Sequence, residues 1–176
     1  MKSLTLTIIG ALFIIFLGTL MHFFYEASGY NYVVGSFSPI NESVWEHLKM
    51  AFFPSILWTL MEMTQIRKTI NNYFVSKAVG TYTMVFLIPV IHYTYTAFMD
   101  DNLIIDIGSF FAAVIIGQTV SFFLFNRTKK SKLQQYTAIA TLVILGTLFV
   151  VFTFYPPHID MFLDSITCTY GLFKSS

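Results

Sequence analysis

The side chains of this chain that could do chemistry gather around one stretch, residues 38–49, in an otherwise apolar sequence. Glu42 and Glu46 in this stretch are carboxylates and His47 is an imidazole, and such groups serve as general acids and bases. Burial would raise the pKa of either carboxylate, so that it could exchange protons with the nearby His47. We therefore predict that Glu42, Glu46 and His47 are catalytic residues if the protein is an enzyme.

A divalent metal site is a second hypothesis for the same region. His22 and Glu26 are four residues apart, so one face of a helix would present both side chains. His92 adds an imidazole from another part of the chain. Histidines with a carboxylate suit zinc and similar cations, and an open coordination position would allow hydrolysis by a bound water. We predict that His22, Glu26 and His92 bind such a metal, although the chain contains no H-E-x-x-H motif.

These residues also have a structural interpretation, which the sequence leaves open. Glu42 and Glu46 would suit the first turns of a helix, where acidic side chains complement the helix dipole. Glu46 and Lys49 are three residues apart and could form an ion pair. Aromatic residues such as Trp45 and Tyr93 are typical of the membrane interface. In the functional interpretation, the predicted substrate-binding residues are Asn41, Trp45, Tyr93 and Asp106.

The elements that must position these side chains are membrane spans. The chain has 176 residues, of which 56% are hydrophobic and 11% charged, whereas soluble proteins have about 25% charged residues. A span requires about 20 apolar residues, so the chain has room for about five spans. We predict a single all-α integral membrane domain, a bundle of five transmembrane helices over residues 4–25, 42–65, 73–97, 103–125 and 136–154.

The positions of Lys and Arg predict the orientation, because the cytoplasmic connections of membrane proteins are rich in these residues. Basic residues flank the second predicted connection and cluster in the fourth: Arg67, Lys68, Lys77, Arg127, Lys129, Lys130 and Lys132. We therefore place the N-terminus in the cytoplasm and the C-terminus outside. All four histidines then lie at the outer face, and the tail after residue 155 is expected to fold back over it.

Two local features of the second span can also be predicted. Ser38, which is followed by proline, is a suitable N-cap for this helix, and Asn41 is a second possible cap. Near the inner end of the span, Glu62 is expected to reach the cytoplasmic surface or to pair with Arg67 or Lys68.

Composition and motifs narrow the possible functions. The chain has no basic patch or binding module of the kind that recognises nucleic acid. Its single cysteine, Cys168, excludes an intramolecular disulfide and a cysteine-based zinc site. The leading hypothesis is a membrane-embedded enzyme that acts on an amphiphilic or lipid-linked substrate in an outer-face pocket. The alternative is a non-catalytic subunit that binds lipid or a partner protein or transports a solute, either alone or as a homo-oligomer.

Transport would need a polar path through the bundle. Glu62, Lys77, Gln118 and Ser121 place a few polar groups in the inner half of the predicted spans. The chain contains no internal repeat of the kind found in many transporters, which disfavours a monomeric transporter.

Three motifs carry a resemblance to a known family. They are His22-x-x-x-Glu26, the run Ser38-Pro39-x-Asn41-Glu42-Ser43-x-Trp45-Glu46-His47-x-Lys49, and a tail that extends from Pro156-Pro157-His158 to Tyr170-Gly171. Over most of its length the chain resembles a family of small multi-pass bacterial membrane proteins that is known only as a domain of unknown function. The resemblance implies a protein of the bacterial cytoplasmic membrane and brings no activity with it.

Overall fold

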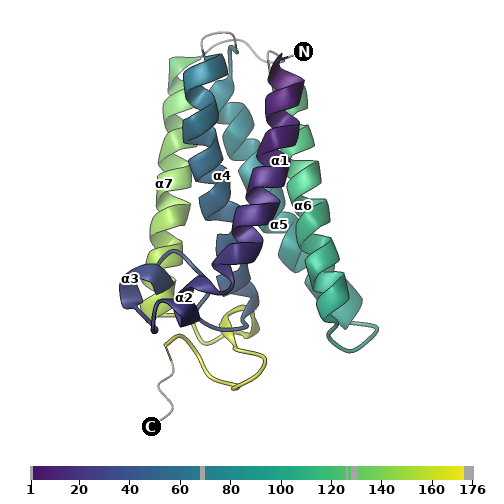
Figure 1. Ribbon diagram of the computed structural model, residues 1–176, viewed down its shortest axis with the longest axis vertical. Helices are drawn as coiled ribbons and strands as arrows, with labels where there is room; N and C mark the ends of the chain where they lie inside the picture. The colour runs from purple at the N-terminus through teal and green to yellow at the C-terminus, as the bar shows by residue number, and fades with distance from the viewer. Residues whose placement is uncertain (1, 68–69, 126, 128–130, 173–176) are drawn as a thin grey trace.

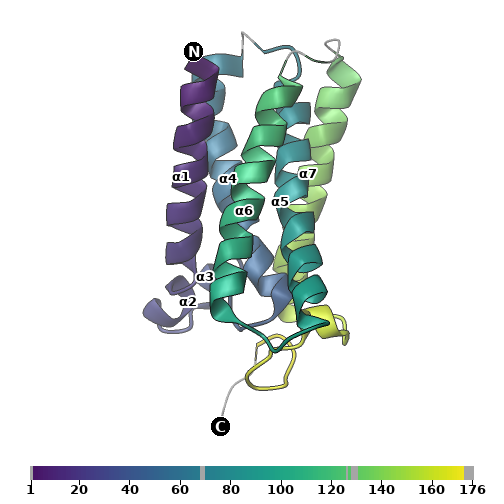
Figure 2. The same cartoon turned by 90° about the vertical axis from the view of Figure 1, so that its right-hand side faces the viewer.

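The computed structural model describes residues 2–67, 70–125, 127 and 131–172. In this part of the chain, long helices pack side by side into a bundle, and consecutive long helices run in opposite directions (Figures 1 and 2). The long helices are α1 (Lys2–Met21), α4 (Val44–Ile66), α5 (Tyr73–Thr96), α6 (Leu103–Leu124) and α7 (Lys132–Phe154). Shorter elements are α2 (Phe24–Ala27), α3 (Tyr32–Gly35) and the 3-10 helix η2 (Asp160–Phe162).

The alternating helices give the bundle two chemically different ends. At one end α1, α5 and α7 finish and α4 and α6 begin, and we call it the histidine end because it carries His22, His47, His92 and His158. The opposite end carries Arg67, Lys77, Arg127 and Lys132, and we call it the basic end. The structure thus brings all four histidines to one end, as the predicted order of helices requires.

Four helices, α1, α5, α6 and α7, are long and apolar enough to cross a membrane by length and composition. The fifth long helix, α4, has 23 residues, but it contains Glu46, Lys49 and Glu62, which lower its hydropathy. All three of these side chains are buried, because α4 packs against α1, α5 and α7. The architecture is all-helical and consistent with a membrane protein, and it places its most polar long helix against three others.

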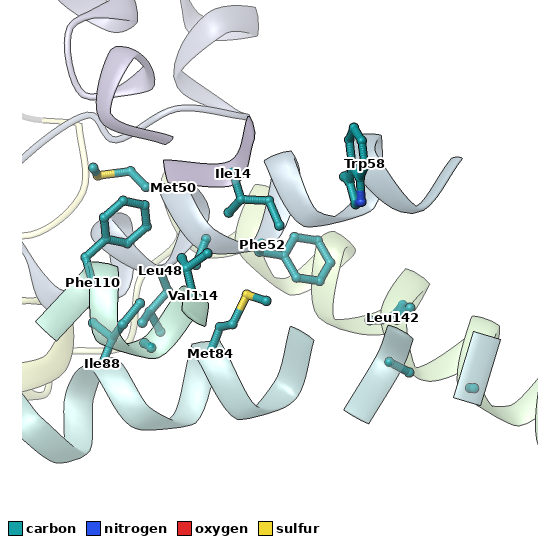
Figure 3. Close-up of a cluster of buried hydrophobic side chains, with 14 of the residues drawn as sticks. Ile14, Leu48, Met50, Phe52, Trp58, Met84, Ile88, Phe110, Val114 and Leu142 are labelled. Carbon is teal, nitrogen blue, oxygen red and sulfur yellow. The ribbon is translucent and has the colours of Figure 1, made fainter. Parts of the chain in front are cut away.

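The core lies where the long helices meet, and apolar side chains such as Phe52, Met84 and Val114 fill it (Figure 3). Helices α5 and α6 approach each other closely at two glycines, Gly80 and Gly117. A Cβ atom added to Gly117 would lie 2.6 Å from the carbonyl oxygen of Gly80, so any larger residue would push the helices apart. Glycine at this crossing permits the close backbone contact that is typical of helices packed in membranes.

The boundaries of α4 differ from the prediction. The helix begins at Val44, and its N-cap is Ser43, whose Oγ accepts a hydrogen bond of 3.4 Å from the backbone N–H of Glu46. Neither predicted cap is the N-cap of α4. Ser38 Oγ donates to the carbonyl of Val34 at the end of α3, and Asn41 Oδ1 accepts a hydrogen bond from the N–H of Ser43. Ser38 is therefore hydrogen-bonded to α3, a short helix before α4 that the sequence pattern does not predict.

The tail folds back onto the segment that precedes α4, as predicted. The backbone N–H of Glu42 donates to Asp164 Oδ1 at 3.3 Å, and Asn41 Nδ2 donates to the carbonyl of Gly171 at 3.2 Å. The hydroxyl of Ser165 donates to the carbonyl of Glu42 at 3.4 Å. These contacts hold the segment that carries Glu42 at the histidine end.

Candidate metal centre

His22, Glu42 and His47 form a cluster at the histidine end. His22 follows the last residue of α1, Glu42 precedes α4, and His47 lies in its first turn. The Nε2 atoms of His22 and His47 lie 3.5 Å and 3.3 Å from the two carboxylate oxygens of Glu42. One potential ligand atom from each residue lies within 4.8 Å of the other two. The carboxylate thus lies between two imidazoles. A single cation bound among these three side chains could contact all of them.

The backbone sets the orientation of His47. Its Nδ1 lies 2.9 Å from the carbonyl oxygen of Ser43, which can only accept a hydrogen bond, so Nδ1 carries a proton. In a neutral ring, Nε2 would then present a lone pair to the Glu42 carboxylate. Two lone pairs repel each other, so this contact requires either a second proton on His47 or a metal ion. Histidine ligands of metals commonly donate their other ring nitrogen to a backbone carbonyl in this way.

The charge of Glu42 is strongly stabilised. Contacts with His22 and then His47 hold the pKa of the Glu42 carboxyl well below its usual range. The side chains of His22, Glu42 and His47 are 32%, 36% and 30% exposed, so water or a ligand can reach them. The carboxylate is therefore ionised and accessible at neutral pH, as a metal ligand must be.

A cavity of about 290 Å³ lies beside the cluster. Glu42 lines it together with the tail, and the other lining residues are Ile40, Asn41, Asp164, Ile166, Thr167 and Gly171. Asp164 accepts hydrogen bonds from its own loop, including one from the hydroxyl of Thr167. Glu42 is thus shared between the histidine cluster and a pocket that could hold the polar part of a ligand.

A second cluster at the same end joins His92 on α5 to Asp101 and Asp106. His92 Nδ1 lies 3.0 Å from Asp106 Oδ1, and the hydroxyl of Tyr95 donates to Asp101 Oδ1 at 2.6 Å. The hydrogen bond from Tyr95 lowers the pKa of Asp101, and hydrogen bonding to Asp106 lowers it further. Both clusters therefore lie at the histidine end of the bundle.

The second cluster includes a residue that the sequence analysis misses. This residue is Asp101, which is not among the predicted site residues. The feature of the sequence that indicates the position of Asp101 is Asn102. It is the N-cap of α6, and its side chain accepts hydrogen bonds from backbone N–H groups in the first turn of that helix. A cap at this position places Asp101 immediately outside the helix and Asp106 in its first turn, near the end of α5.

Glu46 lies apart from the histidine cluster, in a buried ion pair with Lys49. Lys49 Nζ is 2.6 Å from Glu46 Oε2, as the spacing of the two residues predicts. It also donates to Thr153 Oγ1 at 2.5 Å and to the carbonyl of Gly35 at 3.0 Å. Glu46 Oε2 accepts a further bond from the N–H of Ile40 at 3.1 Å. These contacts use all three ammonium donors, so the geometry favours a structural role for Glu46.

Other predicted site residues lie outside both clusters. Glu26 is exposed on α2, because α1 ends at Met21 and no continuous helix presents it beside His22. Trp45 packs against Phe149 and Phe162, with ring centroids 4.7 Å from each, and belongs to an aromatic core. Tyr93 is exposed next to His92, and Asn41 lines the cavity beside Glu42.

A second buried ion pair lies towards the basic end. Lys77 Nζ is 2.5 Å from Glu62 Oε2, and both side chains are at most 2% exposed. The hydroxyl of Tyr73 is 3.1 Å from the same carboxylate oxygen. Glu62 Oε1, Gln118 Oε1 and Ser121 Oγ are buried without a hydrogen-bond partner among the described residues. This pair is less completely hydrogen-bonded than the pair of Glu46 and Lys49.

Comparisons with known proteins identify a family and no activity. Among curated proteins and among solved structures, none matches the chain. Residues 2–172 match a family of unknown function, DUF6512, and the chain belongs to that family.

Proposed function

We propose that the chain is a five-span protein of the bacterial plasma membrane, with the basic end in the cytoplasm and the histidine end outside. The distribution of Arg67, Arg127 and Lys132 supports this orientation, because cytoplasmic ends are rich in basic residues. The fifth span is α4. Ionisable groups within a membrane are tolerated when they pair inside the protein, as those of α4 do.

At the histidine end we infer a centre in which His22, Glu42 and His47 bind one divalent metal and catalyse hydrolysis. The single observation that carries this proposal is the contact of two imidazoles with one ionised carboxylate, with His47 oriented by the carbonyl of Ser43. Two histidines and a glutamate are a known ligand set of catalytic zinc, which keeps a further position for water. Metal binding would make that water a nucleophile near neutral pH.

The surroundings of the centre favour an amphiphilic substrate. The cavity beside Glu42 offers the side chains of Asn41 and Thr167 as hydrogen-bonding groups for a polar headgroup. Phe23 and Phe37 are exposed at the same end of the bundle and could contact an apolar chain. The bond to be hydrolysed would therefore lie at the headgroup of a lipid or lipid-linked molecule in the outer leaflet.

Metal-dependent turnover tests this proposal. The purified protein, loaded with Zn²⁺ or Mn²⁺ in detergent, is incubated with phospholipids and isoprenoid phosphates, and released headgroups are measured by mass spectrometry. We expect hydrolysis that chelator abolishes and that His22→Ala or His47→Ala reduces by at least about 100-fold, the order of a lost catalytic group. Glu26→Gln is the matched control and retains activity. Metal binding without turnover of any of these substrates would contradict the enzymatic assignment.

The buried pair of Glu62 and Lys77 supports a second candidate, a transport function. Unpartnered polar atoms in a core are sites where water or an ion can be held. Transport predicts that proteoliposomes containing the wild-type protein dissipate a proton or cation gradient and that Glu62→Gln abolishes the flux. Equal flux in empty liposomes and in proteoliposomes would exclude this candidate for the ions tested.

A further inference from the structure

A second cavity, of about 230 Å³, lies at the basic end between the start of α5 and the start of α7. Two basic residues line it: Arg67, at the end of α4, and Lys132, at the start of α7. Its remaining lining is largely apolar and aromatic: Ile70, Asn71, Tyr73, Phe74, Gln135, Tyr136 and Ile139. The cavity thus combines two cationic groups with an apolar wall.

Among the described residues, no carboxylate pairs with the cations of this cavity. The described residues of the basic end include a single acidic side chain, Glu62, and it is buried in its pair with Lys77. No ion pair joins Arg67 or Lys132 to a carboxylate within the described residues. The positive charge of the cavity is therefore available to an external anion.

The walls of the cavity are held in place by hydrogen bonds between helices. Gln135 on α7 accepts a bond from the backbone N–H of Phe74 at 2.9 Å and donates to the carbonyl of Asn71 at 3.4 Å. The guanidinium carbon of Arg67 lies 5.0 Å from the centroid of the Phe74 ring. This stacking positions the guanidinium and leaves its N–H groups free of a carboxylate, so it can bind an oxyanion.

The apolar surface next to the cavity indicates what kind of anion fits. Leu133 and Tyr136 are 76% and 68% exposed on the first turns of α7. Farther along the same helix, Val143 and Ile144 are also exposed. A soluble anion would not contact this apolar surface, whereas the acyl chain of a lipid would lie along it. Basic pockets between helices at the cytoplasmic face are suited to the headgroups of anionic lipids.

We propose that this cavity binds the phosphodiester headgroup of an anionic phospholipid, with Arg67 and Lys132 holding the phosphate and the acyl chains lying against α7. The site is at the opposite end of the bundle from the histidine cluster. It would be a specific lipid-binding site of the inner leaflet and is independent of the proposed hydrolytic centre.

Titration of the full-length protein in a neutral detergent tests the proposal. Short-chain phosphatidylglycerol is the probe, phosphatidylcholine is the zwitterionic comparison, and bound lipid is counted by native mass spectrometry. The double variant Arg67→Gln/Lys132→Gln should bind phosphatidylglycerol about 30-fold more weakly, since each cation contributes about fivefold. The control Lys2→Gln/Arg127→Gln removes the same charge from the same end outside the cavity and should change affinity less than threefold, roughly.

Several results would overturn the proposal. Equal weakening in both double variants would show diffuse attraction to a basic surface, and equal binding of phosphatidylcholine would show that charge has no part in recognition. Displacement of the lipid by inorganic phosphate at a similar concentration would assign the cavity to free phosphate. Thermal unfolding of each variant without lipid verifies that the fold is retained, which is expected because Arg67 and Lys132 are exposed.

Discussion

Glu42 and Glu46 lie four residues apart at the same end of the bundle, yet their surroundings are opposite. Glu46 is buried with a side-chain exposure of 4%, and it contacts an ammonium whose donors are all used. Glu42 is 36% exposed, and its two oxygens face two imidazoles whose charge depends on pH. A fixed cation neutralises Glu46, whereas Glu42 has partners that can exchange a proton for a metal.

This difference separates a residue that holds the fold from one that could act on a ligand. The pair of Glu46 and Lys49 joins α4 to α7 through Thr153 and to the end of α3 through Gly35. It is well suited to fix the position of α4, and Glu42 lies just before this fixed point. The neighbouring pair thus provides a rigid support on which the histidine cluster can be built, as functional sites require.

The largest expected effect is on the buried pair. Lys49→Met leaves the carboxylate of Glu46 buried without a counter-charge, which should lower the free energy of unfolding by about 3–5 kcal/mol. Thermal unfolding in detergent measures the loss. The double variant Glu46→Leu/Lys49→Met removes both charges and should be less destabilised than Lys49→Met. A Lys49→Met protein as stable as the wild type would remove the distinction between the two glutamates.

The next effect is on metal binding. Glu42→Gln removes a charged ligand and should weaken the binding of Zn²⁺ by more than about 100-fold, since even outer-shell partners change affinity by about 10–100-fold. The metal-free variant should unfold within about 1 kcal/mol of the wild type, because exposed ion pairs contribute little. Competition with a chromophoric chelator measures the affinity. Unchanged affinity for Zn²⁺, or a large loss of stability, would show that Glu42 has a structural role and is not a metal ligand.

A smaller effect is expected at Thr153, the hydroxyl partner of Lys49. Thr153→Val keeps the side-chain shape and removes a hydrogen bond to a charged group, for a predicted loss of about 1.5–3 kcal/mol. The measurement is again thermal unfolding, with metal affinity as the second readout. We expect metal affinity to change only slightly. A protein that loses metal and keeps its stability would show that Thr153 belongs with the histidine cluster.

The smallest effect is the pH dependence of stability. The pKa of folded Glu42 is lowered from its usual 4.5, so its contribution is complete above pH 4.5 and is lost as the pH falls towards the folded value. The metal-free wild type should therefore lose stability below about pH 4.5 more steeply than Glu42→Gln. Melting temperatures between pH 6 and pH 3.5 provide the test. Identical pH profiles would indicate that the contacts with His22 and His47 do not stabilise the ionised carboxylate.

The arrangement of helices is largely predictable from the sequence. Apolar length and the placement of basic residues predict the order and direction of the long helices, which is sufficient to bring His22, His47 and His92 to one end. The pair of Glu46 and Lys49 follows from their spacing on one helix face. The membership in a family of unknown function is also confirmed. Local spacing and hydropathy are sufficient for the helix order and the ion pair, whereas the family prediction depends on the resemblance of three motifs.

Contacts between distant segments could not be predicted in the same way. Glu62 pairs with Lys77 on another helix, and the predicted pairing with Arg67 is wrong; Lys68, the other predicted partner, lies outside the described residues. The spacing of His22 and Glu26 is misleading because the helix ends between them. Periodicity indicates which residues share a helix face, whereas these partners depend on where helices end and how they pack.

X-ray absorption at the zinc K-edge, recorded on the zinc-loaded protein, tests the central claim most directly. If His22, Glu42 and His47 bind one ion, the spectrum shows two imidazole rings, with Zn–N distances of about 2.0–2.1 Å, and additional oxygen ligands. His47→Ala should then remove one ring from the spectrum, whereas the control His158→Ala should leave it unchanged. A spectrum without imidazole scattering, or one that His47→Ala does not alter, would contradict the proposed centre.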